Sequence, residues 1–159
     1  MPSEDKRSGL SHLDARGRAR MVDVGAKPLQ ARRARAEGTI ALQAATRAMI
    51  REDRIAKGNV LTVAQIAAVQ AAKRTAELIP LCHPLALDAI DVELDLIEGG
   101  VVARAEVRCT GRTGVEMEAL TAVSVALLTV YDMCKAVDRT MRIGDIYLVE
   151  KEKSDVTNH

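Results

Sequence analysis

Apolar and charged residues alternate along the middle of the chain. Residues 90–96 place Ile, Val, Leu and Leu at every second position, with Asp and Glu between them. Residues 103–109 repeat this with Ala, Ala, Val and Cys between Arg and Glu, and Glu98-Gly99-Gly100 separates the two runs. A period of two on both sides of a glycine turn predicts an antiparallel β-hairpin. Its charges are opposite in sign on the two strands, as cross-strand pairing favours, so we interpret the polar face as a solvated surface.

The long apolar run of residues 115–137 has a different pattern. Nearly every residue is apolar or small, which predicts a helix buried on several sides. Four ionisable residues interrupt it: Glu116, Glu118, Asp132 and Lys135. Charges inside such a helix are costly unless they are paired, hydrogen-bonded or used, so this helix is the first place to look for chemistry.

Shorter elements complete the predicted order. Thr62 is expected to cap a helix that runs to about Leu78, stops at Pro80 and carries an apolar stripe of Ile66, Val69, Ala76 and Ile79. The remaining elements are a strand at 21–24, an ambiguous strand or helix start at 35–42, a helix at 43–51, a basic loop at 54–59 and a last strand at 143–151.

This order predicts an α+β sandwich in which helices pack on one face of an antiparallel sheet. The βαββαβ core within it is the ferredoxin-like arrangement. We divide the chain into a mobile N-terminal arm (1–20), a single ferredoxin-like domain (21–151) and a C-terminal tail (152–159).

Composition narrows the function classes. Hydrophobic residues make up 48% of the chain, but there is no Phe or Trp and only two Tyr, which argues against nucleic-acid modules that stack bases on aromatic rings. The three cysteines are widely spaced and odd in number, which favours a reduced, cytoplasmic setting. Residues 1–10 are charged rather than apolar and no charge-free apolar run spans a bilayer, so neither a signal peptide nor a membrane partner is expected.

Charge is distributed unevenly along the chain. Residues 1–60 hold 13 Lys and Arg against 7 Asp and Glu, and residues 61–159 hold 10 against 15. The basic set includes Arg32, Lys57, Lys73 and Arg74, each of which alone reads as a surface charge. Together they could hold phosphates, although no P-loop or GxGxxG motif is present.

The ionisable residues of the long helix have different explanations. Thr113 and Glu116 have the spacing of a capping box, which is a sufficient structural reason for Glu116 but not for Glu118. Asp132 and Lys135 share a helix face, either as a simple ion pair or as a general acid/base unit in which apolar surroundings lower the pKa of the lysine.

Helix geometry separates the two groups. Glu118 and Asp132 are fourteen residues apart, about 21 Å along the axis, although they differ by only about 40° around it. They therefore share a face but not one small pocket. Either they serve opposite ends of a long ligand, or two subunits each contribute one end of this helix, and we prefer the second.

The segment Ile79-Pro80-Leu81-Cys82-His83-Pro84-Leu85 is a second locus. Its prolines hold it extended, so Cys82 and His83 face opposite ways and are not expected to grip one metal. A lone histidine is more often structural than a ligand. Its place in a rigid loop after a helix nevertheless makes His83 a candidate for ligand binding or proton transfer.

These segments resemble the cyclic pyranopterin monophosphate synthase family, the C protein of molybdenum cofactor biosynthesis. The resemblance spans about residues 10–150 and rests on several blocks. They are Met21-Val22-Asp23-Val24, Gln70-Ala71-Ala72-Lys73-Arg74-Thr75, Leu78-Ile79-Pro80-Leu81-Cys82-His83-Pro84-Leu85, Thr113-Gly114-Val115-Glu116-Met117-Glu118-Ala119-Leu120-Thr121-Ala122 and Tyr131-Asp132-Met133-Cys134-Lys135-Ala136.

The resemblance implies a lyase that needs no cofactor, and we assign no metal-ligating residues. It would convert 3′,8-cyclo-7,8-dihydroguanosine 5′-triphosphate to cyclic pyranopterin monophosphate and diphosphate, in a homohexamer built as a trimer of dimers with sites at subunit interfaces. Asp132 and Lys135 match the family's catalytic pair. Residues that match its substrate-binding positions are Leu81, Cys82, His83, Met117, Glu118, Lys57, Lys73 and, by a looser alignment, Arg32.

The chain departs from the family pattern at its C-terminal end. The family usually closes with Gly-Gly-Lys-Ser-Gly, whereas Val149-Glu150-Lys151-Glu152-Lys153-Ser154-Asp155 follows Leu148 here. Lys151 and Lys153 are the candidate substitutes for the family's lysine. The alternative function is that of an inactive paralogue, which would act as a nucleotide-binding or interaction module.

Overall fold

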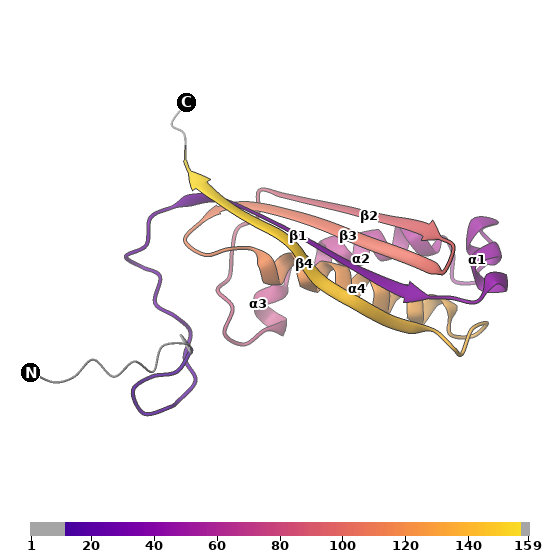
Figure 1. Ribbon diagram of the computed structural model, residues 1–159, viewed down its shortest axis with the longest axis horizontal. Coiled ribbons are helices and arrows are strands. Elements are labelled where there is room, and N and C mark those ends of the chain that lie inside the picture. The colour runs from indigo at the N-terminus through magenta and orange to yellow at the C-terminus, as the bar shows by residue number, and fades with distance from the viewer. Residues whose placement is uncertain (1–11, 157–159) are drawn as a thin grey trace, which may run out of the picture.

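The computed structural model describes residues 12–156 and contains one four-stranded antiparallel sheet covered by helices. The strands are β1 (Gln30–Ala41), β2 (Ala89–Ile97), β3 (Gly100–Gly111) and β4 (Arg142–Asp155), in the order β2-β3-β1-β4. The helices are α1 (Ala44–Arg51), α2 (Val60–Lys73), α3 (Thr75–Leu78) and α4 (Glu116–Cys134). The α+β sandwich with its βαββαβ order is confirmed, and α2 and α4 cover the same face of the sheet (Figure 1).

Helix α4 is the centre of the core. It packs on β1, β3 and β4 and, within the helical layer, on α2, so it is buried on several sides as its apolar sequence predicts. By length and composition it could also cross a membrane, but 56% of that stretch is buried inside the fold, as in the core helix of a folded domain. The close contact between β1 and α4 depends on Gly38 of β1. A Cβ at this position would lie 2.8–3.0 Å from the side chains of Ile146, Val123 and Leu127.

The N-terminal predictions need correction. Residues 21–24 form no strand, and the first strand is β1, which resolves the ambiguous segment 35–42 as a strand down to Ala41. In β1 the buried residues Ala34 and Ala36 alternate with exposed or partly exposed ones. This alternation is weak in the sequence, because the inward residues are small and arginines stand at 32, 33 and 35. Of the predicted arm, residues 1–11 lie outside the described residues, and Leu13 forms an isolated β-bridge with Ala19. Strand β4 continues to Asp155, beyond its predicted end at Lys151.

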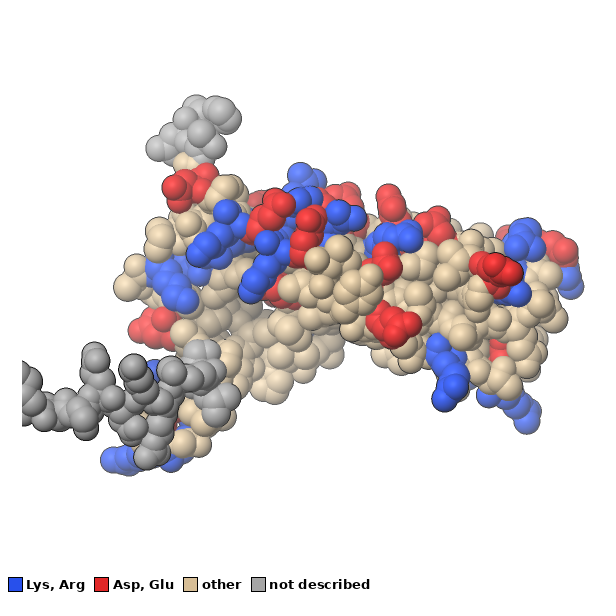
Figure 2. All heavy atoms as spheres, viewed as in Figure 1, with Lys and Arg blue, Asp and Glu red and all other residues tan. Residues whose placement is uncertain are grey.

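The predicted hairpin is confirmed as β2 and β3, and its outer face carries a network of ion pairs. Arg104 pairs with Asp95 and with Glu37 of β1, and Arg108 pairs with Asp91. Asp91 lies directly across from Glu106, a residue of the same charge. The ion pairs therefore form mostly between residues that are diagonal neighbours on β2 and β3, or between β3 and β1, and not between directly facing residues. Figure 2 shows acidic and basic side chains interleaved along this side of the molecule, which fits the interpretation of a solvated face.

Helix α2 begins earlier and faces differently than predicted. The amide of Thr62 donates to Asn59 Oδ1 at 2.9 Å, so Asn59 is the N-cap and Thr62 lies inside the helix. The predicted apolar stripe is wrong at Ile66, which is 55% exposed, whereas Val69 is partly buried against the core. The buried face consists of small residues that let α2 approach α4 closely: Val60, Ala64, Ala68, Ala71 and Ala72.

The hairpin turn gives a first stability prediction. A Cβ on Gly100 would collide with the backbone carbonyl of Ile40, which cannot move without disturbing the β1–β3 pairing. Gly100→Ala is expected to lower the free energy of unfolding by about 1–3 kcal/mol, measured by chemical denaturation. Gly99→Ala is the matched control, since nothing lies within 4 Å of its added Cβ. Equal stabilities of the two variants would contradict this reading of the turn.

Candidate active site

Five predicted substrate-binding residues lie around one cavity of about 310 Å³ at the N-terminal end of α4. Leu81, Cys82 and His83 reach it from the proline-bounded loop after α3, and Met117 and Glu118 from the first turn of α4. The rest of the lining is His12, Val22, Val24, Lys27, Thr113, Gly114 and Glu116. Two stretches of sequence more than thirty residues apart therefore meet at this end of the helix.

His83 is held by the segment that the sequence suggested was a strand. Its Nε2 lies 2.7 Å from the carbonyl oxygen of Val22. A carbonyl can only accept, so Nε2 carries a hydrogen and donates it in this contact. The residues around Val22 thus fix the orientation of the imidazole instead of extending the sheet.

Glu118 is a buried carboxyl group in the wall of this cavity. The residue is 4% exposed, and desolvation together with the nearby charge of Glu116 raises its pKa above the ordinary value. Burial also raises the pKa of the Cys82 thiol, helped by the charge of Glu118. Both pKa values move in the same direction, because burial disfavours the charged form of each group.

The buried carboxyl group makes stability depend on pH in a defined direction. Because its folded pKa is raised, the folded chain holds a proton that the unfolded chain releases, so stability falls as pH rises from about 4.5 through the folded pKa. Glu118→Gln is expected to remove this fall and raise the melting temperature at pH 7, measured by thermal denaturation from pH 4 to 8. Glu98→Gln, at an exposed turn residue, is the control. An unchanged pH profile in Glu118→Gln would contradict the assignment.

The predicted capping box between Thr113 and Glu116 is wrong. The N-cap of α4 is Val115, without a side-chain cap, and the Glu116 carboxylate forms an ion pair with Lys151 Nζ at 3.1 Å. Strand β4 brings Lys151 to this position because the strand continues past Leu148 without the glycines of the family pattern, through a register shift at Val149, and pairs with β1 as far as Asp155. Glu116 therefore joins the C-terminal strand to the start of α4.

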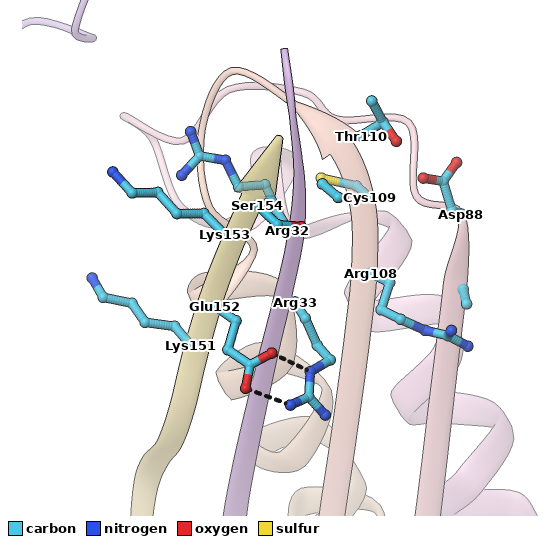
Figure 3. Close-up of a pocket in the computed structure, with 12 residues that line it drawn as sticks. Arg32, Arg33, Asp88, Arg108, Cys109, Thr110, Lys151, Glu152, Lys153 and Ser154 are labelled. Carbon is cyan, nitrogen blue, oxygen red and sulfur yellow. Dashed lines mark hydrogen bonds and ion pairs between the residues drawn. The ribbon is translucent and has the colours of Figure 1, made fainter. Parts of the chain in front are cut away.

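Basic side chains gather beside this junction. A cavity of about 250 Å³ is lined by Arg32, Arg33, Gly114, Glu116, Lys151, Glu152 and Lys153. Figure 3 shows Arg32, Lys151 and Lys153 extending on the same side of the strands, while Glu152 is held by Arg33. Arg32 donates to the Arg112 carbonyl at 3.4 Å, but its Nε is buried without a partner. The arrangement leaves unused donors that suit an anion.

The predicted catalytic pair lies at the opposite end of α4. Lys135 Nζ contacts Asp132 Oδ1 at 2.7 Å, and Lys57 Nζ contacts Asp132 Oδ2 at 2.8 Å and donates to the Asp132 carbonyl at 3.1 Å. Hydrogen bonds and charge from the two lysines, Lys135 first, lower the pKa of Asp132 to about 2. The same pairing raises the pKa of Lys135, so the expectation of a lowered lysine pKa is wrong for the isolated chain.

Exposure explains that correction. The side chains of Lys135, Asp132 and Lys57 are 57%, 55% and 49% exposed, so the apolar surroundings expected from the sequence cover the inner face of α4 and not these groups. The lowered pKa of Asp132 and the raised pKa of Lys135 both favour the charged forms of this pair. The cluster therefore consists of two solvent-exposed ammonium groups, those of Lys135 and Lys57, which both contact the Asp132 carboxylate.

Lys73 joins neither group. It ends α2 as an exposed residue and lines a separate cavity of about 450 Å³ with Leu85, Asp88 and other residues. The residues of the predicted basic set therefore do not form one group. Arg32 lies at one end of α4, Lys57 lies at the other, and Lys73 and Arg74 lie at the end of α2. Within residues 12–156, no three His, Cys, Asp or Glu side chains are arranged to hold a metal ion.

Comparison with known proteins identifies relatives along most of the chain. The family model described as "MoaC family" matches residues 21–154. The chain is 58% identical over 144 residues to cyclic pyranopterin monophosphate synthase of Parvibaculum lavamentivorans, covering 89% of this chain and 90% of that protein. It is 56% identical over 146 residues to molybdenum cofactor biosynthesis protein 1 of Drosophila melanogaster, covering 91% of this chain and 26% of that longer protein.

Proposed function

This chain belongs to the MoaC family, and from that membership we infer that it is a cyclic pyranopterin monophosphate synthase acting early in molybdenum cofactor biosynthesis. Its substrate is the cyclised dihydroguanosine triphosphate, and its products are cyclic pyranopterin monophosphate and diphosphate. The observation that carries this conclusion is the 58% identity that extends over 90% of a synthase of that name. The convergence of Leu81, Cys82 and His83 with Met117 and Glu118 in one cavity supports the proposed placement of the substrate.

The two ends of α4 supply different parts of the chemistry. At the N-terminal end, Arg32, Lys151 and Lys153 offer the cations that a triphosphate requires. The oriented His83 ring and the buried Glu118 carboxyl group, whose pKa is raised, offer proton-transfer and hydrogen-bonding groups. At the C-terminal end, the charged Lys135 can donate a proton or stabilise developing negative charge, and Asp132 orients it. No residue has to change oxidation state in this scheme, and we propose that the reaction needs no cofactor.

One chain does not bring the two ends together. They are about 21 Å apart along α4, which exceeds the reach of one small pocket. The helix also carries apolar side chains on its exposed face, where Leu128 is 57% and Tyr131 37% exposed. Ile66 of α2 is exposed as well. We propose that subunits pack through such surfaces so that Asp132 and Lys135 of one chain complete the cavity of another, in a trimer of dimers.

The altered C-terminal segment supports one alternative. Lys151 is paired with Glu116 and lies in strand β4 opposite Ala34, whereas the family pattern has flexible glycines around its lysine. A chain whose lysine is held in this way could bind the nucleotide without converting it, which is the inactive-paralogue function.

Incubation of the purified oligomer with the cyclised substrate distinguishes these functions. We expect cyclic pyranopterin monophosphate and one equivalent of diphosphate, detected by chromatography and a coupled phosphate assay, in the presence and absence of a metal chelator. Binding by calorimetry without product would favour the inactive paralogue. A folded oligomer that neither binds the substrate nor forms the product would overturn the assignment.

A further inference from the structure

Asp138 is a buried carboxylate that the proposed reaction does not use. It is 1% exposed and lies in the turn between α4 and β4. Its Oδ2 accepts from the Gln43 amide at 2.9 Å and from Thr46 Oγ1 at 3.0 Å, and its Oδ1 accepts from the amide and hydroxyl of Thr140, each at 3.0 Å. Burial would raise its pKa, but these four hydrogen bonds outweigh it and hold the pKa below the ordinary value.

These hydrogen bonds join the two segments that carry the charged cluster. Asp138 follows Lys135 by three residues, and its own amide donates to the Cys134 carbonyl at 3.0 Å, so it is fixed to the last turn of α4. Gln43 and Thr46 belong to the start of α1. The carboxylate therefore links the end of α4, with Asp132 and Lys135, to the beginning of α1.

Helix α1 in turn positions Lys57. The loop after α1 is tied back to it where the Arg54 amide donates to the Met49 carbonyl at 2.8 Å. Ile55 is 6% exposed and anchors the loop in the core, and the Gly58 amide donates to the Ile55 carbonyl at 3.0 Å. A shift of α1 relative to α4 would carry this loop, and the Lys57 ammonium, away from Asp132.

We propose that Asp138 is a positioning residue for the reaction: it fastens α1 to the end of α4, so that Lys57 and Lys135 meet the two oxygens of Asp132. This role rests on the proposed function. A merely structural Asp138 would support the stability of the fold without affecting how Lys57 lies against Asp132, and the two roles give different results.

Two substitutions weaken the link to different degrees. In Asp138→Asn, whichever way the amide turns, its nitrogen faces the Gln43 or the Thr140 N–H, and one backbone donor loses its acceptor. Thr46→Val removes a single hydrogen bond and keeps the shape, so it preserves the test if the first variant does not fold. Val92→Ala, in the buried part of β2, is the control for simple destabilisation.

Kinetics test whether Asp138 acts through Lys57. Asp138→Asn is expected to lower kcat/KM by about 100-fold, Thr46→Val by less, and Val92→Ala to leave it within about threefold. In a Lys57→Ala background, Asp138→Asn should change kcat/KM by no more than about threefold, because the group it positions is already absent. Additive losses, or an equal loss in Val92→Ala, would overturn the proposal.

Lysine labelling tests the same placement without turnover. We expect acetic anhydride, followed by mass spectrometry, to modify Lys57 slowly in the wild type and several-fold faster in Asp138→Asn, with Lys73 unchanged. Unchanged labelling of Lys57 in a folded variant would overturn the positioning role. If the wild type lacks turnover, the proposed function fails while the labelling still decides whether Asp138 places Lys57.

Discussion

Replacing Lys135 by alanine is expected to lower kcat by about 10²- to 10⁴-fold, the range over which a positioned acid or base contributes to catalysis. The fold and the oligomer should persist, because the Lys135 side chain is 57% exposed and its contact with Asp132 lies on the surface of α4. Steady-state turnover of the cyclised triphosphate, together with circular dichroism and sedimentation, measures both outcomes. Arg139→Ala removes a nearby exposed cation and serves as the control.

Lys135→Arg separates two contributions of the lysine. Arginine keeps the positive charge, but its pKa is too high for it to release a proton during turnover. Substantial activity in this variant would indicate that the charge alone matters, whereas activity as low as in Lys135→Ala would indicate proton transfer. Full activity of Lys135→Ala itself would refute the catalytic assignment.

The second large effect is recovery of activity by mixing two inactive variants. Lys135→Ala disables the C-terminal end of α4, and His83→Ala disables the cavity at the other end. If each site takes one end from each of two chains, random assembly of equal amounts leaves about one quarter of the sites with both ends intact. Activity should therefore rise from nearly zero to about a quarter of the wild type after co-refolding.

Controls make the mixing experiment decisive. Each variant refolded alone measures its residual activity, and mixing without refolding shows whether chains exchange between oligomers. A rate equal to the mean of the two parents would mean that one chain holds the whole site. A sedimentation mass of 17.2 kDa, that of one chain, would contradict shared sites independently.

The predictions that held depend on strong local patterns. The hairpin of β2 and β3 follows from its alternation and glycine turn, and the apolar run around residues 115–137 is a core helix because no other environment accommodates it. The contact between Asp132 and Lys135 also follows from local geometry, since residues three apart on a helix are neighbours.

The predictions that failed depend on contacts with distant residues. Thr113 and Glu116 have the spacing of a capping box, but Lys151 from the last strand offers Glu116 an opposite charge. Ile66 is larger and more apolar than the alanines of α2. The alanines are nevertheless the buried residues, because the space between α2 and α4 admits small side chains. Burial of α4 as a whole likewise did not predict that Lys135 and Asp132 stay exposed.

By itself, the sequence determined the fold class, the central helix, the hairpin and the identity of the candidate site residues, because these follow from periodicity, helix geometry and family motifs. Only the tertiary structure decided how those residues are grouped: His83 and Glu118 around one cavity, Lys57 with Asp132 at the far end of α4, and Lys73 at neither. It also decided the directions of the pKa shifts, raising the pKa of Glu118 by burial and that of Lys135 by pairing. Grouping and charge depend on which distant segments approach one another, and packing of the whole chain sets that approach.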